Sequence, residues 1–279
     1  MAVASLSANT IASGAESAAP SQPATHSASA SADDSMTTAQ FAELGLPPID
    51  RAWSSHDMSK AAKILQDVAE KKYGSLPRYR SPKSGDVFAR LTSKQNLDRY
   101  KDHSVDVDDR LSEAINYLQS TNEIFKAYLS GFLKKEVPGG ELIELIGMHL
   151  RTSVVMFDLV DEFLPTIKKD DPTYATRMQG FERMKGGLAS IVAGSLKALT
   201  EQDNYTVSER VRLIGYMQDT FPELIPHLTP EARTQIVAQM ETIAGDPSST
   251  QLQPGLDQLR SKVKTLIERE EKARVDRTQ

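Results

Sequence analysis

The stretch ELIELIGMHLRTSVVMFDLVDEFL, residues 141–164, decides the fold of this chain. Apolar side chains occupy most of the circumference of the helix that it predicts, which is typical of a helix buried on nearly all sides. Glycine and proline residues directly before it and a proline directly after it mark its two ends. Its charged residues share one narrow stripe, which we expect to be the only side in contact with water: Glu144, Arg151, Asp158 and Glu162.

Two further long helices are predicted on either side of this central one. Apolar residues recur at helical spacing over residues 108–135 and again over 173–199, and the connections to the central helix are short. Short connections make consecutive long helices antiparallel neighbours. The fold class that follows is all-α, an antiparallel multi-helix bundle with three long central helices and shorter C-terminal helices. Shorter helices are expected over residues 57–73, after Thr206, after Thr229 and over residues 254–274.

Several helix ends are legible in the sequence. Asp57 is predicted to cap the N-terminus of the first helix. Thr206 and Glu209 have the spacing of a capping box, in which each side chain binds a backbone N–H at the start of a helix. Thr229 is followed by Pro230, the residue that best suits the first helical position after a cap.

Three small residues, Gly186, Ser190 and Gly194, recur at four-residue steps within the third long helix. Each glycine costs about 1 kcal/mol of helix propensity relative to alanine, unless close packing offsets that cost. We therefore expect another helix to cross closely here, backbone against backbone.

The chain divides by composition into three parts. Residues 1–35 contain no Lys or Arg and consist largely of Ala, Ser, Thr and Pro, which predicts a disordered tail or linker because so few apolar side chains cannot offset the entropy of ordering. Residues 36–275 are expected to form a single helical domain, in which Trp53 anchors an extended segment and residues 74–103 form an irregular segment. Residues 276–279 are a short polar tail.

The N-terminal tail also bears on the location of the protein. A secretory signal needs a basic region and an apolar core, and residues 1–12 only faintly resemble the end of one. An Ala/Ser/Pro-rich linker is nevertheless typical of exported proteins, so we expect export to the periplasm or the medium. A cytoplasmic protein with an unstructured tail is the alternative.

Composition excludes several classes of function. The chain has 279 residues, with 33 basic against 38 acidic side chains and a net charge of −5, so specific recognition of nucleic acid is not expected. It has no cysteine, which rules out disulfides, thiolate metal sites and cysteine nucleophiles. No apolar run is long enough to span a bilayer, so a soluble protein is expected. Phosphate-binding, dinucleotide and metalloprotease motifs are absent, and we expect neither a cofactor nor a metal.

One segment is strongly basic in this acidic chain. Residues 71–103 carry nine basic and three acidic side chains, with aromatic residues between them. Charge combined with aromatic rings suits a surface that binds an anionic partner, and the candidate binding residues are Arg78, Tyr79, Arg80, Lys83 and Arg90. The alternative is a solvated connection whose aromatic residues pack on the bundle.

A second candidate site lies inside the bundle. His149 falls on the apolar side of the central helix, where a histidine is usually a hydrogen-bonded core residue but can also face a ligand. Methionine side chains on apolar helix faces can line an adaptable pocket, although filling the core is their usual role. The candidate pocket residues are His149, Met156 and Met184.

These observations lead to three hypotheses of function. The first is a non-catalytic helical binding or assembly protein, exported, that holds a partner protein or an anionic surface through the basic segment or its helix faces. The second is a helical-bundle carrier of a hydrophobic small molecule. The third is an enzyme whose active site is assembled from residues far apart in the sequence, for which no positive signal is present.

Overall fold

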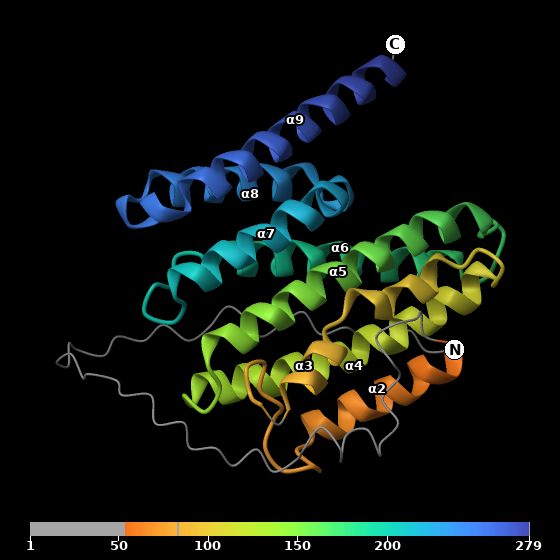
Figure 1. The fold of residues 1–279 in the computed structure, drawn as a ribbon. Coiled ribbons are helices and arrows are strands. Elements are labelled where there is room, and N and C mark those ends of the chain that lie inside the picture. Colours follow the sequence, from red (N-terminus) through yellow and green to blue (C-terminus); the bar gives the residue numbers. More distant parts are fainter. Residues whose placement is uncertain (1–53, 83, 279) are drawn as a thin grey trace.

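Helices supply the regular structure of the chain. The computed structural model describes residues 54–82 and 84–278, and within these ranges it contains α-helices and short 3₁₀ helices but no strand (Figure 1). The predicted all-α bundle is confirmed. In chain order the elements are α2 (Ser55–Ala69), α3 (Gly85–Leu91), η1 (Lys94–Lys101), α4 (Val107–Leu133), α5 (Gly139–Phe163), η2 (Leu164–Thr166), α6 (Tyr174–Ala198), α7 (Val207–Leu224), η3 (Ile225–His227), α8 (Pro230–Gly245), η4 (Pro247–Leu252) and α9 (Gln253–Thr278).

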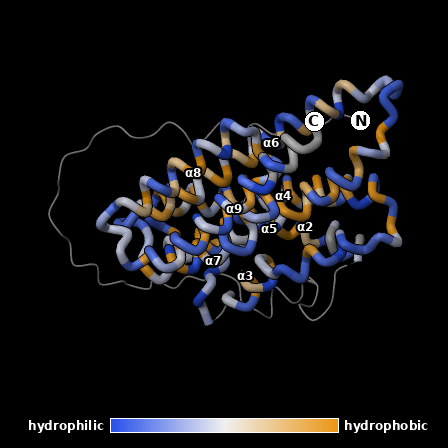
Figure 2. The backbone as a smooth tube through the Cα atoms, turned by 90° about the horizontal axis from the view of Figure 1, so that it is seen from above, coloured by the Kyte–Doolittle hydropathy of each residue, from blue (hydrophilic) through white to orange (hydrophobic). Residues whose placement is uncertain are grey.

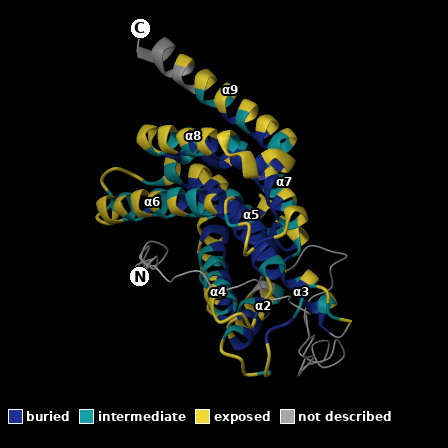
Figure 3. Cartoon of the chain, turned by 90° about the vertical axis from the view of Figure 1, so that its left-hand side faces the viewer, coloured by how far each residue is buried: buried dark blue, intermediate teal, exposed yellow. Residues whose placement is uncertain are grey.

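The core is organised around α5. This helix packs between α4 and α7, while α2 lies on the outside of α4 and α9 lies on the outside of α7 (Figure 1). All ten residues from Glu141 to Leu150 are buried, and most of the length of α5 is buried as well (Figure 3). Polar and apolar residues alternate along the other helices, as expected where one face meets the core and the other meets water (Figure 2).

The expectation that one charged stripe of α5 faces water is wrong for its first half. Glu144 is only 5% exposed, because α7 runs along this side of α5. The carboxylate of Glu144 accepts hydrogen bonds from Arg212 (2.8 Å) and from the hydroxyl of Tyr216, both on α7. A Cβ at Gly147 would lie 2.5 Å from the Tyr216 ring, so the missing side chain of this glycine permits the close approach of the two helices.

The first part of the small-residue ladder on α6 does not mark a helix crossing. Gly186 and Ser190 are exposed, and a Cβ at Gly186 would meet no atom within 4 Å. α6 buries few residues, most of them in its second half, so its first half is held against the bundle only lightly. Because the first half of α6 packs loosely, space is left between it and α5, and the site described below lies in that space.

The helix ends agree with the sequence in most cases. Thr206 and Glu209 form the expected capping box at α7, and Thr229 caps α8 by accepting from the N–H of Ala232. At α2 the cap is Ser54 rather than Asp57. Asp57 is the third helical residue and completes a capping box, so the helix begins earlier than the apolar pattern indicates.

The structure describes the C-terminal end of the chain but not its N-terminal part. The predicted tail over residues 1–35 and Trp53 lie outside the described residues. At the other end, α9 buries Leu256, Leu259 and Val263 and then projects beyond the body of the bundle (Figures 1 and 3). The helix continues to Thr278, through most of the predicted polar tail. Among the described helices, none combines the length and the apolar character of a membrane span.

Candidate functional site

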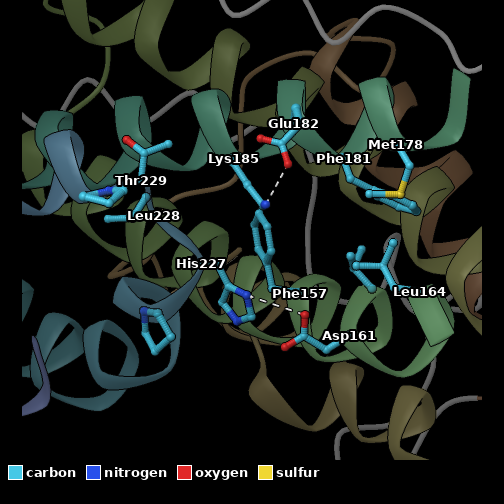
Figure 4. A pocket seen from close by; sticks show the side chains of 13 residues that line it. Phe157, Asp161, Leu164, Met178, Phe181, Glu182, Lys185, His227, Leu228 and Thr229 are labelled. Atoms are coloured by element: carbon cyan, nitrogen blue, oxygen red, sulfur yellow. Dashed lines mark hydrogen bonds and ion pairs between the residues drawn. The ribbon is translucent and has the colours of Figure 1, made fainter. Parts of the chain in front are cut away.

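A groove of about 460 Å³ lies between the C-terminal half of α5, the first half of α6 and the turn that leads into α8 (Figure 4). We refer to it as the groove. Its size falls within the range typical of small-molecule sites, roughly 300 to 1,000 Å³. It is lined by Phe157, Val160, Asp161, Leu164, Met178, Phe181, Glu182, Lys185, Pro226, His227, Leu228, Thr229 and Pro230.

Three local features of the sequence produce the groove. The apolar pattern of α5 continues to its end, so Phe157 and Leu164 present large side chains beyond the part of the helix that α7 covers. Pro226 lies in the first positions of η3 and Pro230 starts α8, so the two prolines fix the backbone of this wall on both sides of His227. The first half of α6 buries only Phe181, so the space beneath it is not filled by its own side chains.

Five of the thirteen residues that line the groove are polar or charged, namely Asp161, Glu182, Lys185, His227 and Thr229. The His227 imidazole stacks on the Phe157 ring, with 4.8 Å between ring centroids and an interplanar angle of 29°. Its Nδ1 lies 3.8 Å from Oδ1 of Asp161 (Figure 4). Lys185 donates a hydrogen bond of 2.7 Å to Glu182 on the same helix. The groove therefore combines aromatic and aliphatic walls with one carboxylate–imidazole pair and one ion pair at its rim.

Carboxylates gather at this end of the molecule. Contacts between residues 144 and 212 and between 147 and 216 show that α5 and α7 run parallel, so their C-terminal ends lie side by side. Both ends carry acids, Asp158 and Asp161 on α5 and Glu223 on α7, and neither helix has a basic residue in its last turn. The C-terminus of a helix is the negative end of its dipole, so these acids lie where charge of their sign is disfavoured.

The surroundings shift the titration of one of these acids. Loss of hydration, followed by repulsion from Glu223, raises the pKa of Asp158 above its ordinary value. A raised pKa means that the folded protein holds this proton more tightly than the unfolded chain does. The ionised Asp158 therefore lowers stability at neutral pH, and this loss disappears once the pH falls below the unfolded pKa.

We expect Asp158→Asn to stabilise the protein at pH 7, by about 0.5 kcal/mol, which is typical of removing a repulsion between like charges on a helix surface. The gain should vanish at pH 3, where Asp158 is protonated in both states. Thermal unfolding of the wild type and the variant at both pH values measures this difference. Equal or lower stability of the variant at pH 7 would show that the acidic helix ends are not unfavourable.

The comparisons with known proteins add no further constraint on this site. No protein-family model matches the chain, and no curated protein or solved structure matches it at a significant level.

The basic segment contains regular structure and packs on the bundle. It includes α3 and η1, where an irregular connection was expected. The guanidinium of Arg78 donates to the carbonyl of Glu136, and the N–H of Tyr79 donates to the buried carboxylate of Glu141 (3.0 Å). The Tyr79 ring lies edge-on to Phe88 and beneath the guanidinium of Arg212. These contacts fix the segment to the α4–α5 connection, to α5 and to α7.

Several basic side chains of this segment lie close to an acidic side chain. Arg90 lies 3.1 Å from Asp86, and Lys72 lies 2.7 Å from both Asp67 and Glu70. Arg80 is exposed, and Lys83 lies outside the described residues. The structure thus brings Arg78 and Tyr79 into one packed contact region, whereas Arg90 is engaged locally and Arg80 is turned toward water.

The candidate pocket residues do not line the groove. His149 is 8% exposed, its ring lies 5.9 Å from that of Phe125, and its Nδ1 has no hydrogen-bond partner among the described residues. Met156 is fully within the core, and Met184 is half-buried on α6. The methionine that does line the groove is Met178, one helical turn before Phe181. Within the described ranges, no group of three or more ligand side chains is arranged to hold a metal ion.

Proposed function

We propose that this protein is a non-catalytic binding protein that holds the apolar part of a small molecule in the groove. One observation carries the proposal, namely that the groove has a volume of about 460 Å³ and that eight of its thirteen lining residues are aromatic, aliphatic, methionine or proline, with polar and charged groups beside them. Binding sites for small molecules have this composition, because burial of apolar surface supplies the affinity and a few polar groups orient the ligand.

The contacts of the basic segment favour this proposal over an anionic surface as the partner. Arg78 and Tyr79 hold the segment on the bundle, and Arg90 is paired with Asp86, so three of the five candidate binding residues already have partners within the protein. Assembly with a partner protein stays a prediction of the sequence. For an enzyme, the described groups at the groove supply no nucleophile activated by a neighbouring base.

The proposal is tested with N-phenyl-1-naphthylamine, a neutral aromatic probe that fluoresces in apolar surroundings. The full-length protein should bind it with one site. Leu164→Trp places a larger side chain in the groove and should weaken the binding by about tenfold or more. Leu133→Trp is the matched control, because Leu133 is 74% exposed at the end of α4, away from the groove.

Two results would contradict the proposal. The first is the absence of saturable probe binding by the wild-type protein. The second is an equal loss, or no loss, in the two tryptophan variants, since either would place the probe outside the groove. Circular dichroism of both variants verifies that the helical fold is kept.

A further inference from the structure

We infer that the groove selects an organic cation, a molecule with an apolar body and a positively charged head. This inference rests on the proposed function and names the class of ligand. Asp161 supplies the anionic group at the rim, because its side chain is 63% exposed and borders the apolar walls. The apolar body of the ligand would lie against Phe157, Leu164 and Phe181, with its head toward Asp161.

The balance of charge around the rim favours a cation. Lys185 is neutralised by Glu182, with 2.7 Å between Nζ and Oε1. The other acids at this end of α5 and α7 are Asp158, Asp161 and Glu223, next to the His227 imidazole, while Glu162 is paired with Arg110. The guanidinium of Arg233 on α8 is also close, because it donates to the carbonyls of Leu228 and Pro226 in the groove wall. Lys101 also acts on Asp158, but it is an exposed side chain paired with Asp98. Among the residues that line the groove, the two carboxylates of Asp161 and Glu182 outnumber the one ammonium group, that of Lys185.

The helix ends act in the same direction. The parallel C-termini of α5 and α7 each add partial negative charge beside these acids. The N-terminus of α8 also borders the groove and would favour an anion. Its positive end is offset, however, because Thr229 caps it, Pro230 has no N–H and Glu231 lies in its first turn.

Aromatic rings give the site a second way to attract a cation. The negative face of a phenyl ring attracts ammonium and guanidinium groups, and a desolvated contact contributes up to about 2 kcal/mol. This end of the molecule already shows such a contact, since the guanidinium of Arg177 on α6 lies 5.4 Å from the centre of the Phe163 ring. Phe181 packs edge-on against Phe163 and lines the groove.

Acidic side chains near the negative ends of helices lower the stability of the ligand-free protein. A bound cation would reduce this unfavourable interaction. Residues that are unfavourable in the folded chain commonly lie at functional sites. A bound ammonium would offset the repulsion between Asp158, Asp161 and Glu223. The same substitution should therefore act in opposite directions on stability and on cation binding.

The test compares three probes with the same twelve-carbon chain, each below its critical micelle concentration. They are dodecyltrimethylammonium, dodecyl maltoside and dodecyl sulfate, and isothermal titration calorimetry measures their affinities for the full-length protein. The ammonium should bind about tenfold more tightly than the maltoside, and the sulfate should bind most weakly. Asp161→Asn should weaken only the ammonium, by about fivefold at low salt, without lowering the melting temperature of the free protein. Asp203→Asn, an exposed acid beyond the far end of α6, is the matched control and should change nothing.

The outcomes separate this inference from the proposed function. Equal binding of the ammonium and the maltoside, or an unchanged ammonium affinity in Asp161→Asn, would overturn the cation preference while the apolar groove stands. Tighter binding of the sulfate would overturn it as well. If none of the three probes binds, the proposed function itself fails.

Discussion

Replacing Arg110 by alanine should lower the free energy of unfolding by about 3 kcal/mol. Arg110 is only 2% exposed and is among the largest fully buried side chains. Its guanidinium donates to the carbonyls of Tyr100 (3.0 Å) and Val105 (2.9 Å) and pairs with Glu162 on α5. Each buried carbonyl that loses its donor costs about 1 kcal/mol or more, and the space left by the side chain adds to this cost.

The effect should depend on the shape of the guanidinium and on the charge. Arg110→Lys keeps the charge but cannot reach all three acceptors with one ammonium group, so we expect a loss of about 2 kcal/mol. Lys101→Ala, the removal of a nearby exposed cation, should change stability by less than about 0.5 kcal/mol. Chemical denaturation measures all three variants. A loss below about 1 kcal/mol for Arg110→Ala would show that residues 100–105 are not held to the bundle by this side chain.

Lowering the pH from 7 to 5 should destabilise the protein by about 2 kcal/mol through His149 alone. Burial of this imidazole lowers its pKa from 6.5 to about 4. Between these two values the unfolded chain binds a proton that the folded protein does not bind. The stability lost through His149 is therefore small above pH 6.5 and grows as the pH is lowered toward 4, until both states are protonated.

The contribution of His149 is isolated by comparison with His149→Gln, which has similar polarity and does not titrate in this range. Carboxylates contribute equally to both proteins, so the difference between their stability–pH curves belongs to the histidine. We expect the wild type to lose stability more steeply between pH 7 and pH 5. Parallel curves would mean that the His149 ring is solvated in the folded protein, or that a hydrogen-bond acceptor stabilises its protonated form.

The helices could be predicted from the sequence because their signals are local. The apolar pattern of α5 and the caps of α7 and α8 act within a few residues, and the structure begins each of these helices within about two residues of its predicted start. The cap of α2 was misplaced because Ser54 and Asp57 both suit a helix start, and only the backbone conformation decides between them.

The partners of each face could not be predicted in the same way. Glu144 was expected on a wet stripe, but it is covered because Arg212 and Tyr216 on α7 supply hydrogen bonds that a helix pattern does not reveal. The ladder that includes Gly186 has the spacing of a close crossing, yet no other helix lies against that glycine. Helical periodicity gives the direction of a side chain and leaves open which element lies there.

The groove was missed for a related reason. Its walls come from three short segments, residues 157–164, 178–185 and 226–230, which the fold brings together. The prolines on both sides of His227 were a local signal of a rigid turn. The sequence does not show how deeply α6 packs, and this depth decides which methionine lines the groove. Met184 is the predicted residue, and Met178 is the one that lines the groove.

The most direct test of the proposed binding site is the NMR spectrum of the protein labelled at its methionine methyl groups, recorded while N-phenyl-1-naphthylamine is added. Met178 lines the groove, whereas Met148 and Met240 lie in the core away from it. We predict that the Met178 signal shifts in a saturable way and that the signals of Met148 and Met240 stay in place. Shifts confined to Met156, with no change at Met178, would contradict the account and place the ligand inside the bundle instead.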